Sequence, residues 1–112
     1  MDIIVAHNGF VILGVDIIGV VSHGSRPDLG VDAICKAGHF LVELERLSQK
    51  LQSGRMPTGN PEADPPSVHA SIIAGGEEIS LYPARCMISI DRRITAAETL
   101  ESAREELIEI LA

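Results

Sequence analysis

The sequence predicts an α+β fold, a ferredoxin-like two-layer sandwich in which two helices cover one face of a mostly antiparallel sheet. Short stretches of alternating or continuous apolar residues are typical of strands, and two longer stretches with apolar residues every three or four positions are typical of helices. The elements follow in the order hairpin, helix, two strands, helix. We therefore expect a sandwich that lacks its last strand, with an open sheet edge that recruits another chain.

The first two strands are predicted at residues 3–7 and 10–18. The dipeptide Asn8-Gly9 between them suits the positive φ angles of a two-residue hairpin turn. The second strand, FVILGVDII, is almost continuously apolar. We expect it to be covered on both faces, or covered on one face and shared with a partner on the other.

A long helix is predicted from Asp32, its expected cap, to about Ser53. His39 and Glu43 lie four residues apart on its outer face, which we interpret as a solvated face because two ligands do not make a metal site. Residues 54–66 carry four prolines and two glycines and are predicted to form a loop. The expected buried stripe of the helix consists of Ile34, Ala37, Leu41, Leu44, Leu47 and Leu51.

Two antiparallel, half-buried strands and a second helix complete the chain. Thr95 and Glu98 form the ends of a predicted capping box for that helix. One face of the first strand is expected to carry Val68, Ala70 and Ile72, and one face of the second Cys86, Ile88 and Ile90. The helix should bury Leu100, Ala103, Leu107 and either Ile110 or Leu111, with Glu101, Glu105, Glu106 and Glu109 facing water.

Composition narrows the class of protein. A chain of 112 residues fits one domain. A net charge of −7 argues against nucleic-acid binding, which depends on clustered Lys and Arg. The 46% hydrophobic content includes no run of the roughly 18–20 apolar residues that a membrane span needs, so the surplus should cover an interface. Cys35 and Cys86 are expected to be buried and reduced. The start MDIIVAH shows no signal peptide, and a cytoplasmic location is expected.

Two ordered sets of residues carry a resemblance to a known family. Residues 19–34 read GVVSHGSRPDLGVDAI, with His23 at the exit of a strand and an Asp-Ala-Ile helix start. The second half contributes Gly75, Gly76, Pro83, Asp91, Arg93 and Glu98. The chain resembles the dimerisation (lid) domain of zinc-dependent metallopeptidases of the acetylornithine deacetylase, succinyl-diaminopimelate desuccinylase, aminoacylase and carboxypeptidase G type.

The resemblance implies that residues 1–112 are one lid domain excised from a larger enzyme whose catalytic domain, with one or two zinc ions, is absent. The parent would be a homodimer that cleaves an amide bond of an N-acyl amino acid or small peptide. His23 would stabilise the oxyanion in the partner's site, and Arg93 would bind a substrate carboxylate. Ser80 stands where the family often has a substrate-binding Asn, and a hydroxyl presents different donors from an amide. The fragment itself should hold no cofactor and hydrolyse nothing.

Other departures and readings stay open at this point. Ala96 and Ala97 stand where the family usually has Pro and Gly, and Asp32 stands where Asn is more usual. Taken alone, His23 is a turn residue whose imidazole bonds a backbone carbonyl, and Arg93 is a strand-end cation that pairs with Asp91 or a helix carboxylate. The alternative function is a free-standing ferredoxin-like regulatory module that binds a small metabolite.

Overall fold

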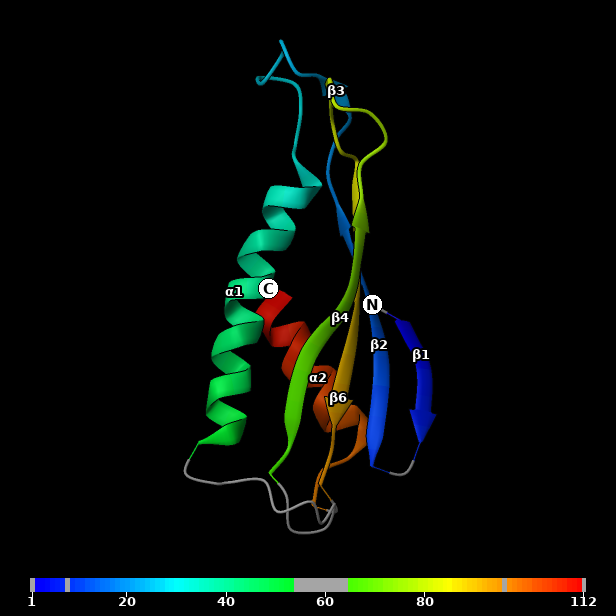
Figure 1. The fold of residues 1–112 in the computed structure, drawn as a ribbon, viewed down its shortest axis with the longest axis vertical. Coiled ribbons are helices and arrows are strands. Elements are labelled where there is room, and N and C mark those ends of the chain that lie inside the picture. Colours follow the sequence, from blue (N-terminus) through cyan, green and yellow to red (C-terminus); the bar gives the residue numbers. More distant parts are fainter. Residues whose placement is uncertain (1, 8, 54–64, 96, 112) are drawn as a thin grey trace.

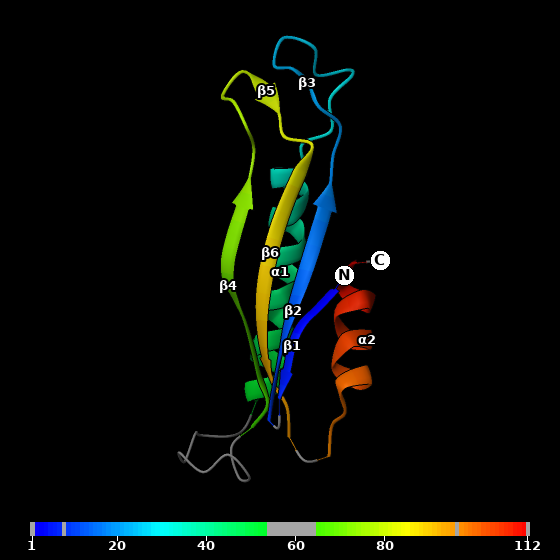
Figure 2. The ribbon, with the colours of Figure 1, turned by 90° about the vertical axis from the view of Figure 1, so that its right-hand side faces the viewer.

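The computed structural model describes residues 2–7, 9–53, 65–95 and 97–111 and shows an elongated molecule of 52 × 26 × 22 Å. A sheet and two helices form two layers, and a small extension projects beyond one end of the sheet (Figures 1 and 2). The elements are β1 (Asp2–His7), β2 (Phe10–Ile18), β3 (Ser22–His23), α1 (Ala33–Gln52), β4 (Ser67–Gly75), β5 (Leu81–Tyr82), β6 (Arg85–Arg93) and α2 (Leu100–Leu111).

The main sheet has the strand order β1-β2-β6-β4, and every neighbouring pair is antiparallel. The predicted hairpin is confirmed, with Gly9 at φ +94° between β1 and β2. No strand follows α2 in the described part of the chain, and β1 and β4 are the two sheet edges. The predicted α+β class with two helices beside an antiparallel sheet is therefore confirmed.

One face of the sheet packs against both helices and forms the core; we call it the helix face and its opposite the outer face. The predicted alternation of β6 is confirmed, but β2 is buried only on the helix face, since Asp16 and Ile18 are exposed. The expectation that β2 is covered on both faces is wrong, because both helices lie on the same side. The core comprises Val11, Leu13, Val15, Ile17, Val68, Cys86, Ile88 and Ile90 from the sheet and Ala33, Ala37, Phe40, Leu44 and Leu107 from the helices.

Helix α1 begins as predicted. The Asp32 carboxylate accepts hydrogen bonds from the backbone N–H groups of Ile34 (2.9 Å) and Cys35 (3.1 Å). The bond from Cys35 is the main cause of a lowered pKa at Asp32. The buried face includes Phe40, whereas Ile34 is 45% exposed, because the stripe starts at Ala33 rather than one residue later. Neither helix is long and apolar enough to cross a membrane, within the described residues.

Strand β4 is an exposed edge, contrary to the prediction of a half-buried strand. Only Val68 is buried, and the register shifts between Ala70 and Ile72. The shift places Ile72 opposite Ser89 on the outer face and Ile73 opposite Ile88 on the helix face. The two isoleucines are 65% and 52% exposed, so this edge presents apolar side chains on both of its faces.

Cys86 is buried as predicted, but Cys35 is exposed near the start of α1, and both thiols are free. The prediction for Cys35 is wrong because Cys35 is not among the residues that α1 buries, which are Ala33, Ala37, Phe40 and Leu44. Burial raises the pKa of the Cys86 thiol, whereas the hydrogen bond with the Asp32 carboxylate raises the pKa of Cys35.

Helix α2 begins later than the predicted capping box. The Glu98 carboxylate accepts the Thr95 N–H at 2.8 Å as expected, but the helix starts only at Leu100. Thr99 and Ser102 form the reciprocal pair: each side-chain oxygen accepts the other residue's backbone N–H at 3.0 Å. Glu98 lies in the turn before α2 and also forms an ion pair with Arg92.

A buried ion-pair cluster surrounds Arg92, whose side chain is 1% exposed. Its guanidinium bonds Glu98 at 2.6 Å and Glu106 at 2.9 Å. Glu106 therefore does not face water as predicted. Burial alone would lower the pKa of Arg92 and raise that of Glu98, but their mutual hydrogen bond and charge outweigh burial. The pKa of Arg92 is raised and that of Glu98 is lowered.

We expect Arg92→Met to lower the free energy of unfolding by about 3 kcal/mol, measured by urea denaturation followed by circular dichroism. The methionine fills much of the same volume, but two partly buried carboxylates lose their cation. The matched control Arg85→Met removes an exposed pair with Asp16 and should lower the free energy of unfolding far less, because water screens that pair. Equal losses of unfolding free energy in the two variants would contradict a stabilising role of the ion-pair cluster around Arg92.

The same variant should change how stability depends on pH. Because the pKa of Glu98 is lowered in the folded state, its contribution is complete above the ordinary glutamate pKa and is lost as pH falls through the folded value. The difference in unfolding free energy between wild type and Arg92→Met should narrow below about pH 4.3. If this difference in unfolding free energy stays constant from neutral pH into the acidic range, Glu98 does not owe its lowered pKa to Arg92.

Candidate functional site

The extension beyond the main sheet brings the two halves of the chain together. Its strands β3 and β5 pair, with Ser22 opposite Tyr82 and His23 opposite Leu81. The N–H of Gly24 donates to the carbonyl of Ser80 at 2.7 Å. We call residues 20–31 and 77–84 the tip. Two of the predicted site residues, His23 and Ser80, thus lie close together at one end of the molecule (Figure 2).

The tip is fastened to the sheet and to the start of α1 by backbone hydrogen bonds. The N–H of Gly19 donates to Ala84 at 2.7 Å, and Val20 and Val31 form a bridge. The ring of Tyr82 packs on Gly30, where a Cβ atom would lie only 2.5 Å from its Cδ2. These contacts fix the direction in which the tip projects.

The imidazole of His23 is exposed, and its Nδ1 lies 2.8 Å from the Ser25 hydroxyl oxygen and 3.2 Å from the Ser25 backbone nitrogen. A backbone N–H can only donate, so Nδ1 accepts and the proton of the neutral ring lies on Nε2. Among the described residues the ring bonds no backbone carbonyl, in contrast to the alternative interpretation of His23 as a turn residue that makes such a bond. His23 therefore presents an N–H donor at the tip.

Ser80 is exposed, and its backbone precedes Leu81, the residue that pairs with His23. Its backbone N–H donates to the Glu78 carboxylate at 3.2 Å, and its hydroxyl bonds no described residue. The hydroxyl is therefore available to a ligand, with the shorter reach expected of Ser in place of Asn.

Arg93 lies far from these two residues. It ends β6 opposite Phe10 and Ser67, while the tip adjoins the other end of β6. The first and last of the nine residues of β6 are about 26 Å apart at about 3.3 Å per residue. One chain cannot bring Arg93 and His23 to the same small molecule. The predicted pair of Arg93 with Asp91 is confirmed at 2.9 Å.

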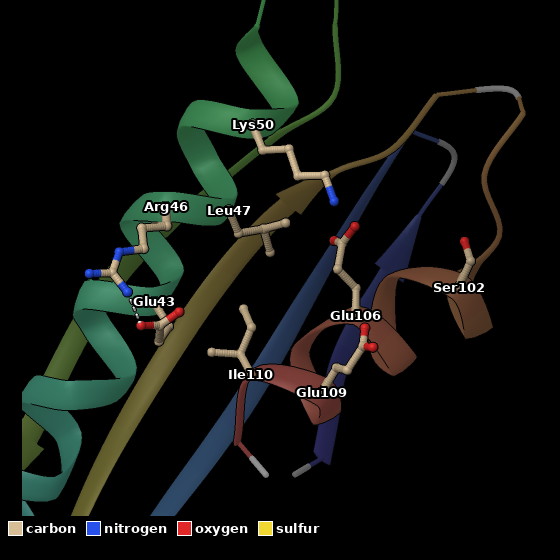
Figure 3. Close-up of a pocket in the computed structure, with 8 residues that line it drawn as sticks. All are labelled: Glu43, Arg46, Leu47, Lys50, Ser102, Glu106, Glu109 and Ile110. Atoms are coloured by element: carbon tan, nitrogen blue, oxygen red, sulfur yellow. Dashed lines mark hydrogen bonds and ion pairs between the residues drawn. The ribbon is translucent and has the colours of Figure 1, made fainter.

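The open groove between α1 and α2, about 510 Å³ in volume, contains none of the predicted site residues (Figure 3). Its α1 wall carries Arg46 and Lys50, and its α2 wall carries Glu106 and Glu109. His39 is exposed near a neighbouring hollow. Among the described residues, no three His, Cys, Asp or Glu side chains group as metal ligands would, so this part of the chain does not fit a zinc site.

Sequence reasoning missed the partner of His23 and the strands that place it. Ser25 is two residues away and contributes both its hydroxyl and a backbone N–H, and every residue type except proline carries the latter. Strands β3 and β5 have two residues each, too short for a visible alternation of apolar residues. The Gly-rich, Pro-containing composition around them was the available signal, and it indicated only turns.

Comparison with known proteins identifies relatives. A family model described as the peptidase dimerisation domain matches residues 5–112. The protein YgeY of Escherichia coli is 35% identical over 99 residues, which cover 83% of this chain and 22% of that protein. An acetylornithine deacetylase of Myxococcus xanthus is 29% identical over 112 residues, which cover 92% of this chain and 29% of that protein. The chain thus spans less than a third of the length of these relatives.

Solved structures share the fold. The aminobenzoyl-glutamate utilization protein of Klebsiella pneumoniae superposes with a TM-score of 0.69 at 15% identity, covering 92% of this chain and 24% of that protein. The aminopeptidase PepT of Bacillus cereus gives a TM-score of 0.65 at 18% identity, with the same coverage. At 15% and 18% sequence identity, these superpositions show that the fold is shared and nothing further.

We expect the neutral His23 ring to be in the Nε2–H tautomer. Long-range ¹H–¹⁵N correlation spectra of the labelled protein, recorded at a pH where the ring is neutral, should show an unprotonated Nδ1. His39, which makes no such bond to a backbone N–H among the described residues, serves as an internal comparison. A protonated Nδ1 at His23 would contradict the geometry described above.

Proposed function

Because this chain belongs to the peptidase dimerisation domain family, we propose that residues 1–112 are the dimerisation and lid domain of a longer zinc-dependent amidohydrolase or exopeptidase. The substrate is an N-acyl amino acid or a small peptide. The observation that carries this proposal is the exposed N–H donor of His23 beside Ser80 on a firmly held tip. The family match favours this reading over a free-standing regulatory module. The chain's share of its relatives' length leaves ample room for a catalytic domain.

We propose that two copies pair through β4 and α1. The outer edge of β4 pairs with no described strand and carries the exposed Ile72 and Ile73, and the neighbouring helix α1 exposes Ile34 and Val42. An open apolar edge is a ready template for a strand of another chain. Antiparallel pairing of β4 with its copy would join the two sheets and bury these side chains.

The distance between His23 and Arg93 within one chain supports an active site that is assembled from two chains. The tip carries His23 and Ser80 away from the end of the sheet where Arg93 lies. In a dimer, the tip of one subunit reaches the catalytic domain of its partner, while Arg93 stays with its own subunit. Each active site would then receive the imidazole from one chain and the guanidinium from the other.

His23 would act on the developing oxyanion of the scissile amide. As water attacks the carbonyl carbon, negative charge gathers on the carbonyl oxygen, and a preorganised N–H donor stabilises that charge in the transition state. The Nε2–H group supplies the donor, while the Ser80 hydroxyl and the Arg93 guanidinium orient the substrate. The one or two zinc ions belong to the catalytic domain, where they would polarise the carbonyl and activate the water.

In the full-length enzyme, His23→Ala should lower kcat by about 10²–10³-fold and change KM by less than about twofold. An oxyanion donor acts mainly in the transition state, so its loss appears in kcat. Steady-state kinetics on a panel of N-acetyl amino acids would measure this effect. His39→Ala, which removes an exposed histidine of α1, is the matched control and should leave both parameters unchanged.

Mixing subunits tests whether His23 acts in the partner's site. A His23→Ala subunit and a subunit inactivated in its catalytic domain are each inactive alone. Their mixed dimer would combine one intact catalytic domain with one intact tip and should regain activity. Absence of recovery, with mixed dimers confirmed by mass, would refute action across the interface.

The double variant Ile72→Lys/Ile73→Lys should convert the dimer to a monomer. Charges on both faces of the β4 edge oppose strand pairing, and both positions are exposed enough to leave the fold intact. Sedimentation velocity would give the mass. The control Ile108→Lys/Leu111→Lys places two charges on exposed positions of α2 and should remain dimeric. A variant of the β4 edge that stays dimeric would disprove this interface.

A further inference from the structure

We infer that Asp91 is a positioning residue for Arg93, holding its guanidinium on the outer face so that most of its donors are free for a substrate carboxylate. This inference rests on the proposed role of Arg93 and adds a residue to that site. Asp91 and Arg93 are two residues apart on β6, so their side chains lie on the same face of the sheet.

The contacts of Arg93 restrain it from two directions. One terminal nitrogen donates to Oδ2 of Asp91 at 2.9 Å, and the guanidinium carbon lies 4.9 Å from the centre of the Phe10 ring. Of the five N–H groups of the Arg93 side chain, only this one has a hydrogen-bond partner among the described residues, and the side chain is 56% exposed. A restrained guanidinium with free donors can bind a carboxylate in two-pronged fashion.

Asp91 is unusual for a surface ion pair because it is buried. The residue is 9% exposed, and its Oδ1 atom is buried with no hydrogen-bond partner in the part of the chain that the structure describes. Its cross-strand neighbours are Ile12 and His69. The His69 ring lies against the Ser71 hydroxyl at 3.3 Å rather than against Asp91. The carboxylate charge is therefore matched by Arg93 alone among the described residues.

A comparable pair on the same face provides the control. Arg85 bonds Asp16 at 2.7 Å at the opposite end of β6, but the Asp16 side chain is 37% exposed, against 12% for Asp91. A flexible, hydrated carboxylate restrains its partner less than one fixed in the sheet surface. Both are arginine–aspartate pairs. They differ in how deeply the aspartate is buried and in the end of β6 at which they lie.

The test replaces each acid by its amide in the full-length enzyme. The probes are an N-acetyl-L-amino acid that the enzyme hydrolyses and the corresponding carboxamide, which lacks the free carboxylate. We expect Asp91→Asn to raise KM about tenfold for the acid, because a misplaced binding group costs one to two orders of magnitude, and to leave KM for the carboxamide unchanged. Asp16→Asn should change neither value.

A second measurement needs no turnover. In ¹⁵N relaxation spectra, the Nε–H of Arg93 should be restrained in the wild-type protein and mobile in Asp91→Asn, while the Nε–H of Arg85 is unaffected by that substitution. A merely structural role for Asp91 would change KM for both probes alike and leave Arg93 restrained.

Two results would overturn the inference while sparing the proposed function. An unchanged or lower KM for the acid in Asp91→Asn would mean that Asp91 only neutralises Arg93, and an Arg93 signal of unchanged mobility would mean that Phe10 suffices. Failure of the proposed role of Arg93 has a different signature: Arg93→Lys would then leave KM for the acid unchanged.

Discussion

The structure depends on the buried guanidinium of Arg92. It lies on the helix face of the central strand β6 and bonds Glu98 in the turn after the strand and Glu106 on α2. A cation that is 1% exposed is tolerable only with such partners, so the sheet, the turn and the second helix must form together. The next residue along the same strand is Arg93. The ion-pair cluster around Arg92 therefore also fixes the end of β6 that carries the proposed carboxylate site.

Local patterns predicted the elements well, and long-range contacts explain where prediction failed. The hairpin, the Asp32 cap and the alternation of β6 depend on neighbouring residues, which the sequence displays directly. The register shift in β4 and the ion pairs of Arg92 depend on residues brought together by folding. Glu98 illustrates the difference: its bond to Thr95 follows from spacing, but its bond to Arg92 does not.

The candidate site shows the same division. His23 and Arg93 were recognisable as chemistry-bearing residues from their motifs, yet only the fold shows that they lie at opposite ends of the sheet. The pairing of β3 with β5, which brings His23 near the backbone of Ser80, involves four residues in all, and about half of the chain separates the two strands. A motif records which residues are present, and the topology decides which of them can meet one ligand.

The hydrogen bond from the Ser25 backbone to His23 has an evolutionary consequence. Because a backbone N–H sets which ring nitrogen carries the proton, residue types other than serine can keep this tautomer at position 25, although they lose the hydroxyl contact at 2.8 Å. Proline is the exception, since it has no amide hydrogen. Lineages of such domains should therefore diversify at this position while excluding a single amino acid.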